Sequence, residues 1–338
     1  MITPFFKSPD ARWALGHGDC VELMDEIAKS GFQFDCVFAD PPYFLSNGGM
    51  SVQSGKQVCV DKGDWDKSHG VEADAAFTRR WLDALRRILK PSGTVWISGT
   101  HHNTFQVANA LVEIGYKILN VIVWQKTNPP PNLSCRYFTY SSEFVVWARR
   151  EEKIPHYFNY DLMHELAGGR QMRDVWPLPA IGRWEKTFGK HPTQKPLSLL
   201  VRILLASTQE GQWVLDPFAG SCTTGIAAHL LGRRFFGIDQ ASEFLDLGIR
   251  RFREAETPQF KAYAFKRIDD LRNMHMEANE ETLEYCCAPP PFLLKGDVAA
   301  EVDITHDGRA AVGEGDGYFP RLGGPVGDDE ESAMRGFD

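Results

Sequence analysis

Short apolar runs alternate along most of the chain with stretches whose apolar residues recur at helical spacing. A short apolar run bounded by turn residues is typical of a buried strand, and apolar positions three and four residues apart are typical of an amphipathic helix. Strands are predicted at 13–15, 34–39, 94–98, 117–125, 142–148, 212–215 and 234–238. Helices are predicted at 20–28, 74–89, 103–113, 196–206, 223–231 and 241–255. This alternation predicts an α/β fold with a mostly parallel sheet and helices on both of its faces.

Several regions interrupt this pattern. Residues 45–70 are rich in Gly, Ser, Asp and Lys and are predicted to form a long loop, in which 46–49 is a candidate lid or simply a flexible turn. Residues 150–192 are rich in Trp, Arg, His, Gly and Pro and show little periodicity. The acidic, Gly-, Asp- and Glu-rich segment 296–338 is predicted to be disordered, and 257–295 is interpreted as a C-terminal extension without a predicted secondary structure.

The composition, 43% hydrophobic and 24% charged, is that of a soluble globular protein. The 338 residues suffice for one large domain with an insertion or for two smaller domains. No long apolar run of a membrane span or a secretory signal is present, so a cytosolic protein is expected. The seven cysteines are scattered without a C-x-x-C pair, which argues against a disulfide framework and a structural zinc site.

The net charge of −8 is unevenly distributed. Residues 296–338 hold eleven acidic and three basic residues, so this segment accounts for the whole excess and the rest of the chain is neutral. Within that rest, residues 121–202 hold twelve basic and seven acidic residues. Because nucleic-acid affinity depends on the local field, the total charge does not exclude DNA, and 121–202 is the expected place for DNA contacts.

One candidate binding site follows the predicted strand 212–215. That strand ends at Asp216, a tight turn contains Gly220, and a helix then begins near Ser221. Ligands of open parallel sheets bind at the carboxyl ends of strands, beside a helix N-terminus. About twenty residues further on, a second strand ends at Asp239, a spacing that suits a carboxylate bound to ribose hydroxyls. A simple sheet turn with a helix cap is the alternative interpretation of this segment alone.

A second candidate site is the tetrapeptide Asp40-Pro41-Pro42-Tyr43, which directly follows the predicted strand 34–39. With DPFAGSCTT at 216–224, it resembles the amino-methyltransferases of bacterial DNA modification, and the order of the two motifs resembles their beta class. Three further stretches resemble family motifs, namely Gly18-Asp19-Cys20, 124–129 (WQKTNP) and 191–196 (HPTQKP). The resemblance covers about residues 13–255. The alternative for the tetrapeptide is an Asp-capped turn.

The resemblance implies a Rossmann-like, seven-stranded, mostly parallel sheet with circularly permuted motif order. Residues 1–126 would form the target-base half, 127–190 a recognition insertion and 191–256 the cofactor half. It implies methyl transfer from S-adenosyl-L-methionine to adenine N6 in DNA, in a bacterial or phage cytosol, without a metal and with a possible homodimer. The alternatives are a cytosine-N4 enzyme of the same fold, an RNA or protein-glutamine methyltransferase, and a non-catalytic DNA-binding protein.

The chemistry of the reaction accounts for the tetrapeptide. An exocyclic amine is a poor nucleophile, and two acceptors on its N–H groups would localise its lone pair on nitrogen. The Asp40 carboxylate and the Pro41 carbonyl are the expected acceptors, with Pro41 and Pro42 holding the backbone still. Tyr43 is expected to stack on a base that has been flipped out of the duplex.

The remaining site residues are also implied by the resemblance. The expected cofactor-binding residues are Asp19, Cys20, Thr193, Lys195, Asp216, Phe218, Gly220, Ser221, Thr223 and Asp239. The expected target-base and DNA contacts are Lys126, Asn128, Arg136, Arg170, Arg173 and Arg183. A set of basic residues also surrounds Trp176 and Trp184, namely Arg136, Arg149, Arg150, Arg170, Arg173, Arg183, Lys186 and Lys190. Basic residues with interleaved aromatics fit a DNA groove, although any one of the charges could simply be solvated. A structural role is expected for His191.

Overall fold

A computed structural model of the chain describes residues 3–46, 49–53, 56–60, 63, 66–129, 131–132, 135–189 and 191–273. The predictions for the acidic segment 296–338 and for 274–295 lie outside the described residues. Asn47 and Gly48 of the candidate lid lie outside them as well.

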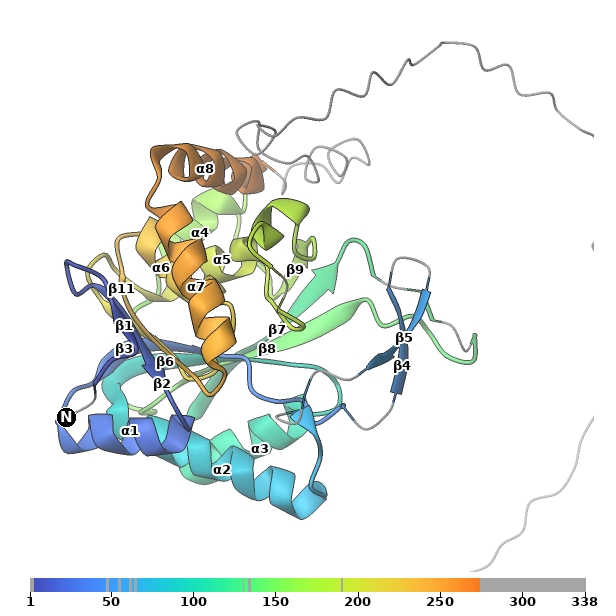
Figure 1. The fold of residues 1–338 in the computed structure, drawn as a ribbon, viewed down its shortest axis with the longest axis horizontal. Coiled ribbons are helices and arrows are strands. Elements are labelled where there is room, and N and C mark those ends of the chain that lie inside the picture. The colour runs from blue at the N-terminus through green and yellow to red at the C-terminus, as the bar shows by residue number, and fades with distance from the viewer. Residues whose placement is uncertain are drawn as a thin grey trace, which may run out of the picture. The chain divides into compact units, whose positions relative to one another are not determined.

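The centre of the fold is one nine-stranded sheet with the order β1-β2-β11-β10-β3-β6-β8-β7-β9 (Figure 1). Its strands are β1 (Phe6–Lys7), β2 (Trp13–His17), β3 (Phe34–Ala39), β6 (Leu89–Gly99), β7 (Lys117–Lys126), β8 (Ser142–Arg149), β9 (Val175–Leu178), β10 (Trp213–Asp216) and β11 (Arg234–Asp239). From β2 to β6 all neighbours are parallel, whereas β8 is antiparallel to both β6 and β7. The predicted fold class is confirmed, but the predicted count of seven strands is too low because the short β1 and β9 extend the two edges.

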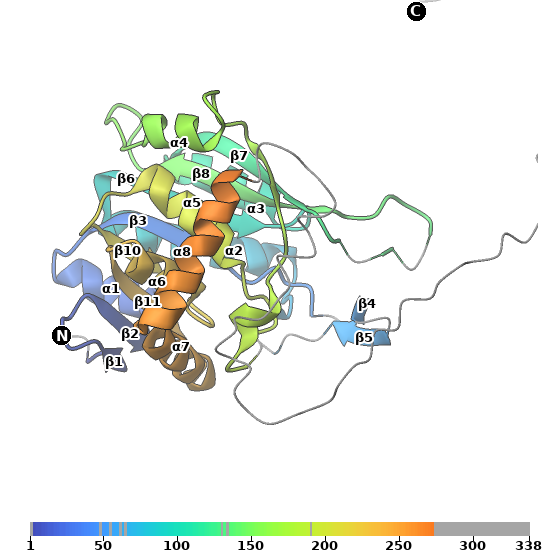
Figure 2. The ribbon, with the colours of Figure 1, turned by 90° about the horizontal axis from the view of Figure 1, so that it is seen from above.

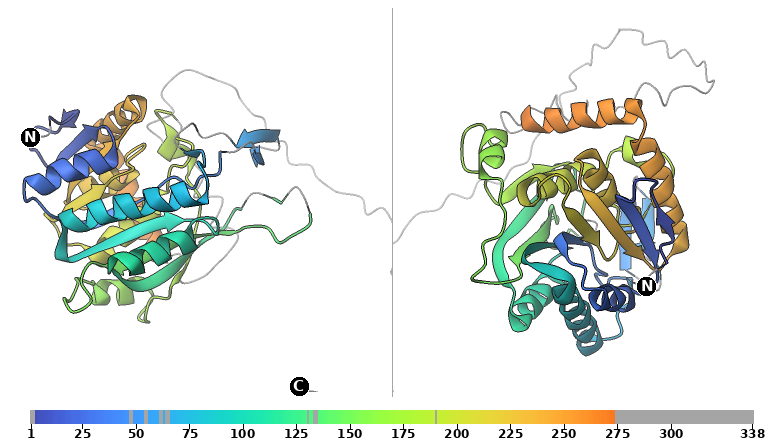
Figure 3. Two further views of the ribbon diagram at one scale, coloured as in Figure 1. Left: turned by 90° about the horizontal axis from the view of Figure 1, so that it is seen from below. Right: turned by 90° about the vertical axis from the view of Figure 1, so that its left-hand side faces the viewer.

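Helices cover both faces of the sheet (Figure 3). One face carries α1 (Cys20–Lys29), α2 (Val71–Ile88) and α3 (Thr104–Ile114). The other carries α4 (Tyr160–Leu166), α5 (Leu197–Ser207), α6 (Thr223–Leu230) and α7 (Ser242–Ala255). Helix α8 (Pro258–Asn273), for which the sequence predicted no structure, lies across α5 and α7 (Figure 2). Within the described residues, no helix is both long and apolar enough to cross a membrane.

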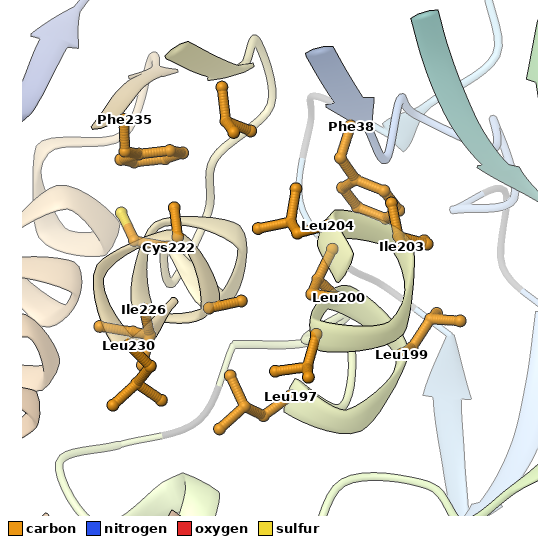
Figure 4. Close-up of a cluster of buried hydrophobic side chains, with 14 of the residues drawn as sticks. Phe38, Leu197, Leu199, Leu200, Ile203, Leu204, Cys222, Ile226, Leu230 and Phe235 are labelled. Carbon is orange, nitrogen blue, oxygen red and sulfur yellow. The ribbon is translucent and has the colours of Figure 1, made fainter. Parts of the chain in front are cut away.

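The core beneath α5 and α6 fixes the cofactor half of the sheet. Helix α5 is apolar on nearly all sides, so it is buried between the sheet, α6 and α8. Figure 4 shows Leu200 and Leu204 of α5 beside Ile226 of α6, with Phe38 and Phe235 of the sheet above them. Burial of such side chains stabilises the fold by about 1.5–3 kcal/mol each. The strand ends that border these helices are therefore held rigidly.

The structure adds regular elements to the segments that interrupt the sequence pattern, and the interpretation of 45–70 as a loop was wrong. The predicted loop 45–70 contains a hairpin of β4 (Gly49–Gln53) and β5 (Lys56–Val60), and strand β6 begins at Leu89 rather than at residue 94. The segment 150–192 contains α4, β9 and the short 3-10 helix η2 (Arg183–Lys186). In β9, pairing with the distant strand β7 overrides local composition, and Pro177 is accommodated because β9 is an edge strand.

Candidate functional site

Four parallel strands end at the same edge of the sheet and bring the two predicted motifs together. At this edge Gly18 follows β2, Asp239 ends β11, the 217–222 turn follows β10 and Asp40 follows β3. A cavity of about 460 Å³ lies at this edge, and its lining includes both Asp40 and Gly220. A volume of this size suits a nucleotide-sized ligand. Residues 180 positions apart in the chain therefore share one cavity.

The cavity lining matches most of the predicted cofactor residues. All of them except Asp19 line it, namely Cys20, Thr193, Lys195, Asp216, Phe218, Gly220, Ser221, Thr223 and Asp239. Asp19 instead caps α1 by accepting hydrogen bonds from the backbone of Val21 and Glu22. The lining also includes Phe77 and Phe244, which the sequence did not indicate. Carboxylates and hydroxyls beside aromatic rings suit a ligand with ribose, amino-acid and aromatic parts.

The turn at Gly220 is closed by Asp239. The Gly220 N–H donates to Asp239 Oδ2 at 2.7 Å, and Oδ1 accepts from the Ala241 N–H at 2.9 Å. Gly220 has φ +48°, and a Cβ there would lie 2.9 Å from His191 Nε2. Glycine is therefore required both by the backbone conformation and by the approach of His191.

Arg251 is a buried residue of this site that sequence reasoning missed. From α7, its Nη1 donates to Ser221 Oγ at 3.0 Å and to Thr223 Oγ1 at 2.9 Å. Burial lowers the pKa of its guanidinium, although nearby Glu185 opposes this. The guanidinium thus fixes the start of α6 against α7. An arginine in an amphipathic helix gives no signal of such a contact.

Asp216 is a buried carboxylic acid at the end of β10. Burial raises its pKa to about 7, against the hydrogen bonds from Thr224 Oγ1 (2.6 Å) and the Phe218 N–H (3.0 Å). At neutral pH the Asp216 carboxyl is therefore ionised in only part of the molecules.

The raised pKa of Asp216 predicts a pH-dependent stability. The unfolded carboxyl titrates near pH 4, so its stabilising contribution is complete below about pH 4 and is lost as the pH rises through about 7. An Asp216→Asn variant has no carboxyl at this position, so it should not lose stability as the pH rises. Between pH 4 and 8 the unfolding free energy of the parent should fall relative to the variant by up to about 4 kcal/mol, measured by urea unfolding. Parallel curves would contradict this, and Asp10→Asn, at an exposed carboxylate whose pKa is lowered, is the control.

The tetrapeptide Asp40–Tyr43 is tied together by hydrogen bonds of the Tyr43 hydroxyl. Tyr43 donates its hydroxyl hydrogen to Asp40 Oδ1 at 2.6 Å, and Ser98 Oγ lies 2.9 Å from the same hydroxyl. The Tyr43 ring is only 7% exposed, so the predicted stacking on a base requires that the ring be uncovered. Pro42 lines the cavity with Asp40, whereas Pro41 is buried.

Lys195 reaches across the cavity to Asp40. Its Nζ donates to Asp40 Oδ2 at 2.6 Å, and Glu143 Oε2 lies 3.8 Å from the same nitrogen. Burial lowers the pKa of Lys195, but Asp40 and Glu143 outweigh burial and raise it overall. Glu143 Oε1 in turn accepts from Lys126 Nζ. The predicted contact of Lys195 with the cofactor carboxylate stays a prediction, and Glu143 is a site residue that the sequence analysis missed.

Asp66 is a second missed residue, and it organises the segment after the tetrapeptide. It is fully buried, and its Oδ1 accepts from the N–H groups of Tyr43 at 2.8 Å and Phe44 at 2.9 Å. Its Oδ2 accepts from Leu45 N–H at 3.3 Å and Ser46 Oγ at 2.8 Å. Phe44 has φ +58°, a conformation that these bonds stabilise. Asp66 lies in the segment interpreted as a loop, where nothing in the sequence singled it out.

The predicted DNA-contacting residues lie at two ends of β9. Lys126 pairs with Leu178, so Asn128 and the exposed Arg183 follow strand ends at the cavity edge of the sheet. Exposed Arg136 lies between β7 and β8, on the loop that leaves the same edge. Arg170 and Arg173 precede β9 and therefore lie at its opposite end. Their roles stay predictions.

One part of the predicted groove was wrong. Trp176 and Trp184 are buried in the core, so they offer no surface to a nucleic acid. Trp176 packs near Trp96 of the central sheet, and Trp184 packs on Tyr263 of α8. These two tryptophans therefore serve packing, and Lys190 of the same basic set lies outside the described residues.

Comparisons with known proteins give the same family as the motifs. The family model described as DNA methylase matches residues 34–250. The type II methyltransferase M2.MboI of Moraxella bovis is 53% identical over 260 residues, which cover 77% of this chain and 94% of that protein. M2.DpnII of Streptococcus pneumoniae, also a type II methyltransferase, is 52% identical over 257 residues, covering 76% and 94%.

Solved structures agree on the fold. The crystal structure of M1.HpyAVI in complex with SAM is 26% identical with a TM-score of 0.56, covering 71% of this chain and 98% of that one. The cytosine-N4-specific PvuII DNA methyltransferase, 16% identical with a TM-score of 0.57, covers 81% of this chain and 95% of its own, and shows the fold alone. With the DPPY and cofactor-loop motifs meeting at one cavity and a family model matching most of the chain, this protein belongs to the DNA methylase family.

Proposed function

We propose that this DNA methylase transfers the methyl group of S-adenosyl-L-methionine to N6 of an adenine flipped out of DNA, as part of a restriction–modification system. The single observation that carries the proposal is that Asp40 and the Gly220 turn line one cavity. The type II methyltransferases that are half identical to this chain support it, as does the relative solved with SAM.

In the proposed reaction Asp40 and Pro41 act on the target amine. Asp40 accepts a hydrogen bond from one N–H group and the Pro41 carbonyl accepts from the other, which favours a localised lone pair on nitrogen. The bound donor supplies a sulfonium methyl group as the electrophile. Because the amine becomes acidic once alkylated, Asp40 takes its proton without being a strong base. Catalysis then depends mainly on position and preorganised charge.

The cofactor half is proposed to hold the donor with the residues that line the cavity. Asp239 keeps unused lone pairs beyond its two backbone bonds, so it can accept from ribose hydroxyls. Phe218 and Phe244 line the cavity and can contact the adenine ring of the donor, and Thr193 lines the same cavity.

The proposed DNA face is the cavity edge of the sheet. Exposed aromatic residues gather there on the loop before β8, with Phe138 95% exposed and Tyr140 stacked on His101 at 4.2 Å between ring centroids. Unstacked bases bind to such rings, and Arg136 on the same loop suits a phosphate. A homodimer and a cytosolic location stay predictions.

The second candidate is methylation of cytosine N4. It shares the fold, because the PvuII enzyme named cytosine-N4-specific has a similar sheet. Adenine is favoured because the tetrapeptide begins with Asp40, whereas the resemblance associates Ser at this position with cytosine enzymes.

The test uses the purified full chain, S-adenosylmethionine with a labelled methyl group, and bacterial genomic DNA. Sequencing of modified bases should find N6-methyladenine at one recurrent sequence. Two synthetic duplexes of that sequence are then compared. In one, every adenine lacks its exocyclic amine, and in the other, every cytosine lacks it. Incorporation of labelled methyl into the duplex that keeps only the cytosine amines would replace adenine N6 with cytosine N4 as the proposed target. Incorporation into RNA or protein but not into DNA would contradict the assignment to DNA.

A further inference from the structure

We infer that Glu143 is a positioning residue of the reaction, because it stands beside the Asp40–Lys195 ion pair as a second acceptor for the Lys195 ammonium. On arrival of the target amine, Lys195 moves from Asp40 to Glu143 and leaves the Asp40 oxygen to the base. The inference rests on the proposed function, since it concerns how an exocyclic amine reaches Asp40.

The first step of the argument is competition at Asp40. Its Oδ1 already accepts from the Tyr43 hydroxyl, and its Oδ2 already accepts from the Lys195 ammonium. A charged donor bonds to a carboxylate more strongly than a neutral amine does. While Lys195 holds Oδ2, the target amine meets a carboxylate whose charge is neutralised. The base therefore needs Lys195 to give way.

The second step is that Glu143 is a second carboxylate beside Lys195, whose Nζ otherwise donates only a long bond of 3.4 Å to the neutral Thr193 carbonyl among the described residues. Its side chain is only 7% exposed, so an ammonium that left Asp40 without a new partner would be a buried, uncompensated charge. Glu143 Oε2 lies 3.8 Å from Lys195 Nζ, and it is a buried atom that accepts no hydrogen bond from any described residue. A movement of about 1 Å brings this pair to hydrogen-bond distance.

The third step is that Glu143 is held ready by the sheet. It lies on β8 opposite Trp124 of β7, and its other oxygen accepts from Lys126 at the end of β7. Two ammonium groups and two carboxylates are thus arranged in the order Lys126, Glu143, Lys195 and Asp40. The group is neutral before and after the movement, so no net charge is left buried in either arrangement.

The test measures recognition of the amine without chemistry. Duplexes carry either adenine or purine, which lacks the 6-amino group, at the target position, and binding is measured with S-adenosylhomocysteine present. The parent is expected to bind the adenine duplex about tenfold more tightly, the worth of one hydrogen bond to a charged group. Glu143→Gln, which keeps the size of the side chain, should reduce this ratio to within about twofold of unity. A variant that folds and keeps the parental ratio overturns the inference.

A second variant separates positioning from structural damage. Adding Lys195→Met to Glu143→Gln should restore the preference for adenine, because no ammonium then competes for Asp40. If the double variant binds the adenine and purine duplexes equally well, as Glu143→Gln is expected to do, Glu143 does not act through Lys195 and the inference is wrong. Should Glu143→Gln fail to fold, Lys195→Met alone decides, since the inference requires that it keep the adenine preference. Glu113→Gln, in the exposed ion pair with Arg79, is the matched control and should change nothing.

Failure of the proposed function would look different. A parent that methylates cytosine instead of adenine overturns the choice of base, whatever the variants do. The same ratio can then be measured with cytosine and with its analogue lacking the 4-amino group, because both bases present an exocyclic amine. Loss of the ratio in Glu143→Gln alone concerns only the inference.

Discussion

An Asp40→Ala variant is expected to methylate DNA about 1000-fold more slowly than the parent, with its affinity for S-adenosylmethionine within about threefold. The reason is that Asp40 supplies the acceptor for the target amine, whereas the donor is held by the glycine turn and Asp239 on other strands. Single-turnover methylation of a duplex at saturating donor measures the rate, and calorimetry measures donor binding.

Two controls keep this result interpretable. Alanine at position 40 leaves the buried Lys195 ammonium without its nearest carboxylate, so the variant will also be less stable. Asp40→Asn keeps the size and one acceptor oxygen but removes the charge, and it should lose most of the rate with less effect on stability. Asp10→Ala, at an exposed carboxylate far along the chain from the motif, should behave as the parent. An Asp40→Ala enzyme with the parental rate would remove this residue from the mechanism.

Much of the fold could be predicted from the hydrophobic pattern. Strands such as β3 and β11 are mostly apolar runs with an acid at or just after their carboxyl end, and α7 has apolar positions at helical spacing, so local sequence determined them. The edges could not be predicted in this way. Strand β9 forms because four residues pair with β7 and bury Trp176, a contact that depends on the finished sheet.

The residues of the candidate site also fall into those that the sequence pattern predicted and those that depend on distant contacts. Asp40, Asp216, Asp239 and Gly220 stand at strand ends, and parallel strands bring such positions to one edge regardless of distance in the chain. Glu143, Asp66 and Arg251 were missed because each acts on a partner that is remote in sequence. A glutamate within an apolar strand could have been noticed, since a charge in a buried strand needs a buried partner.

Asp66→Ala is expected to reduce both activity and stability. The substitution removes the acceptor of three backbone N–H groups and one hydroxyl in residues 43–46, which start at the last residue of the tetrapeptide. Leaving these donors without a partner should lower the free energy of unfolding by about 3 kcal/mol, measured by urea unfolding. Displacement of Tyr43 and Asp40 by even about 1 Å should lower the methylation rate about 100-fold.

The loss of stability and the loss of methylation rate in Asp66→Ala respond differently to conditions, so they can be measured separately. The stability loss acts through the folded fraction, so it disappears from the rate once donor, DNA and a low temperature keep the variant folded. The rate loss persists under those conditions because the tetrapeptide itself has moved. Donor affinity should stay within about threefold of the parent, since Asp66 does not line the cavity. If the folded variant instead recovered the full rate, Asp66 would stabilise the protein without positioning Asp40, and the backbone of 40–43 would be held by its prolines alone.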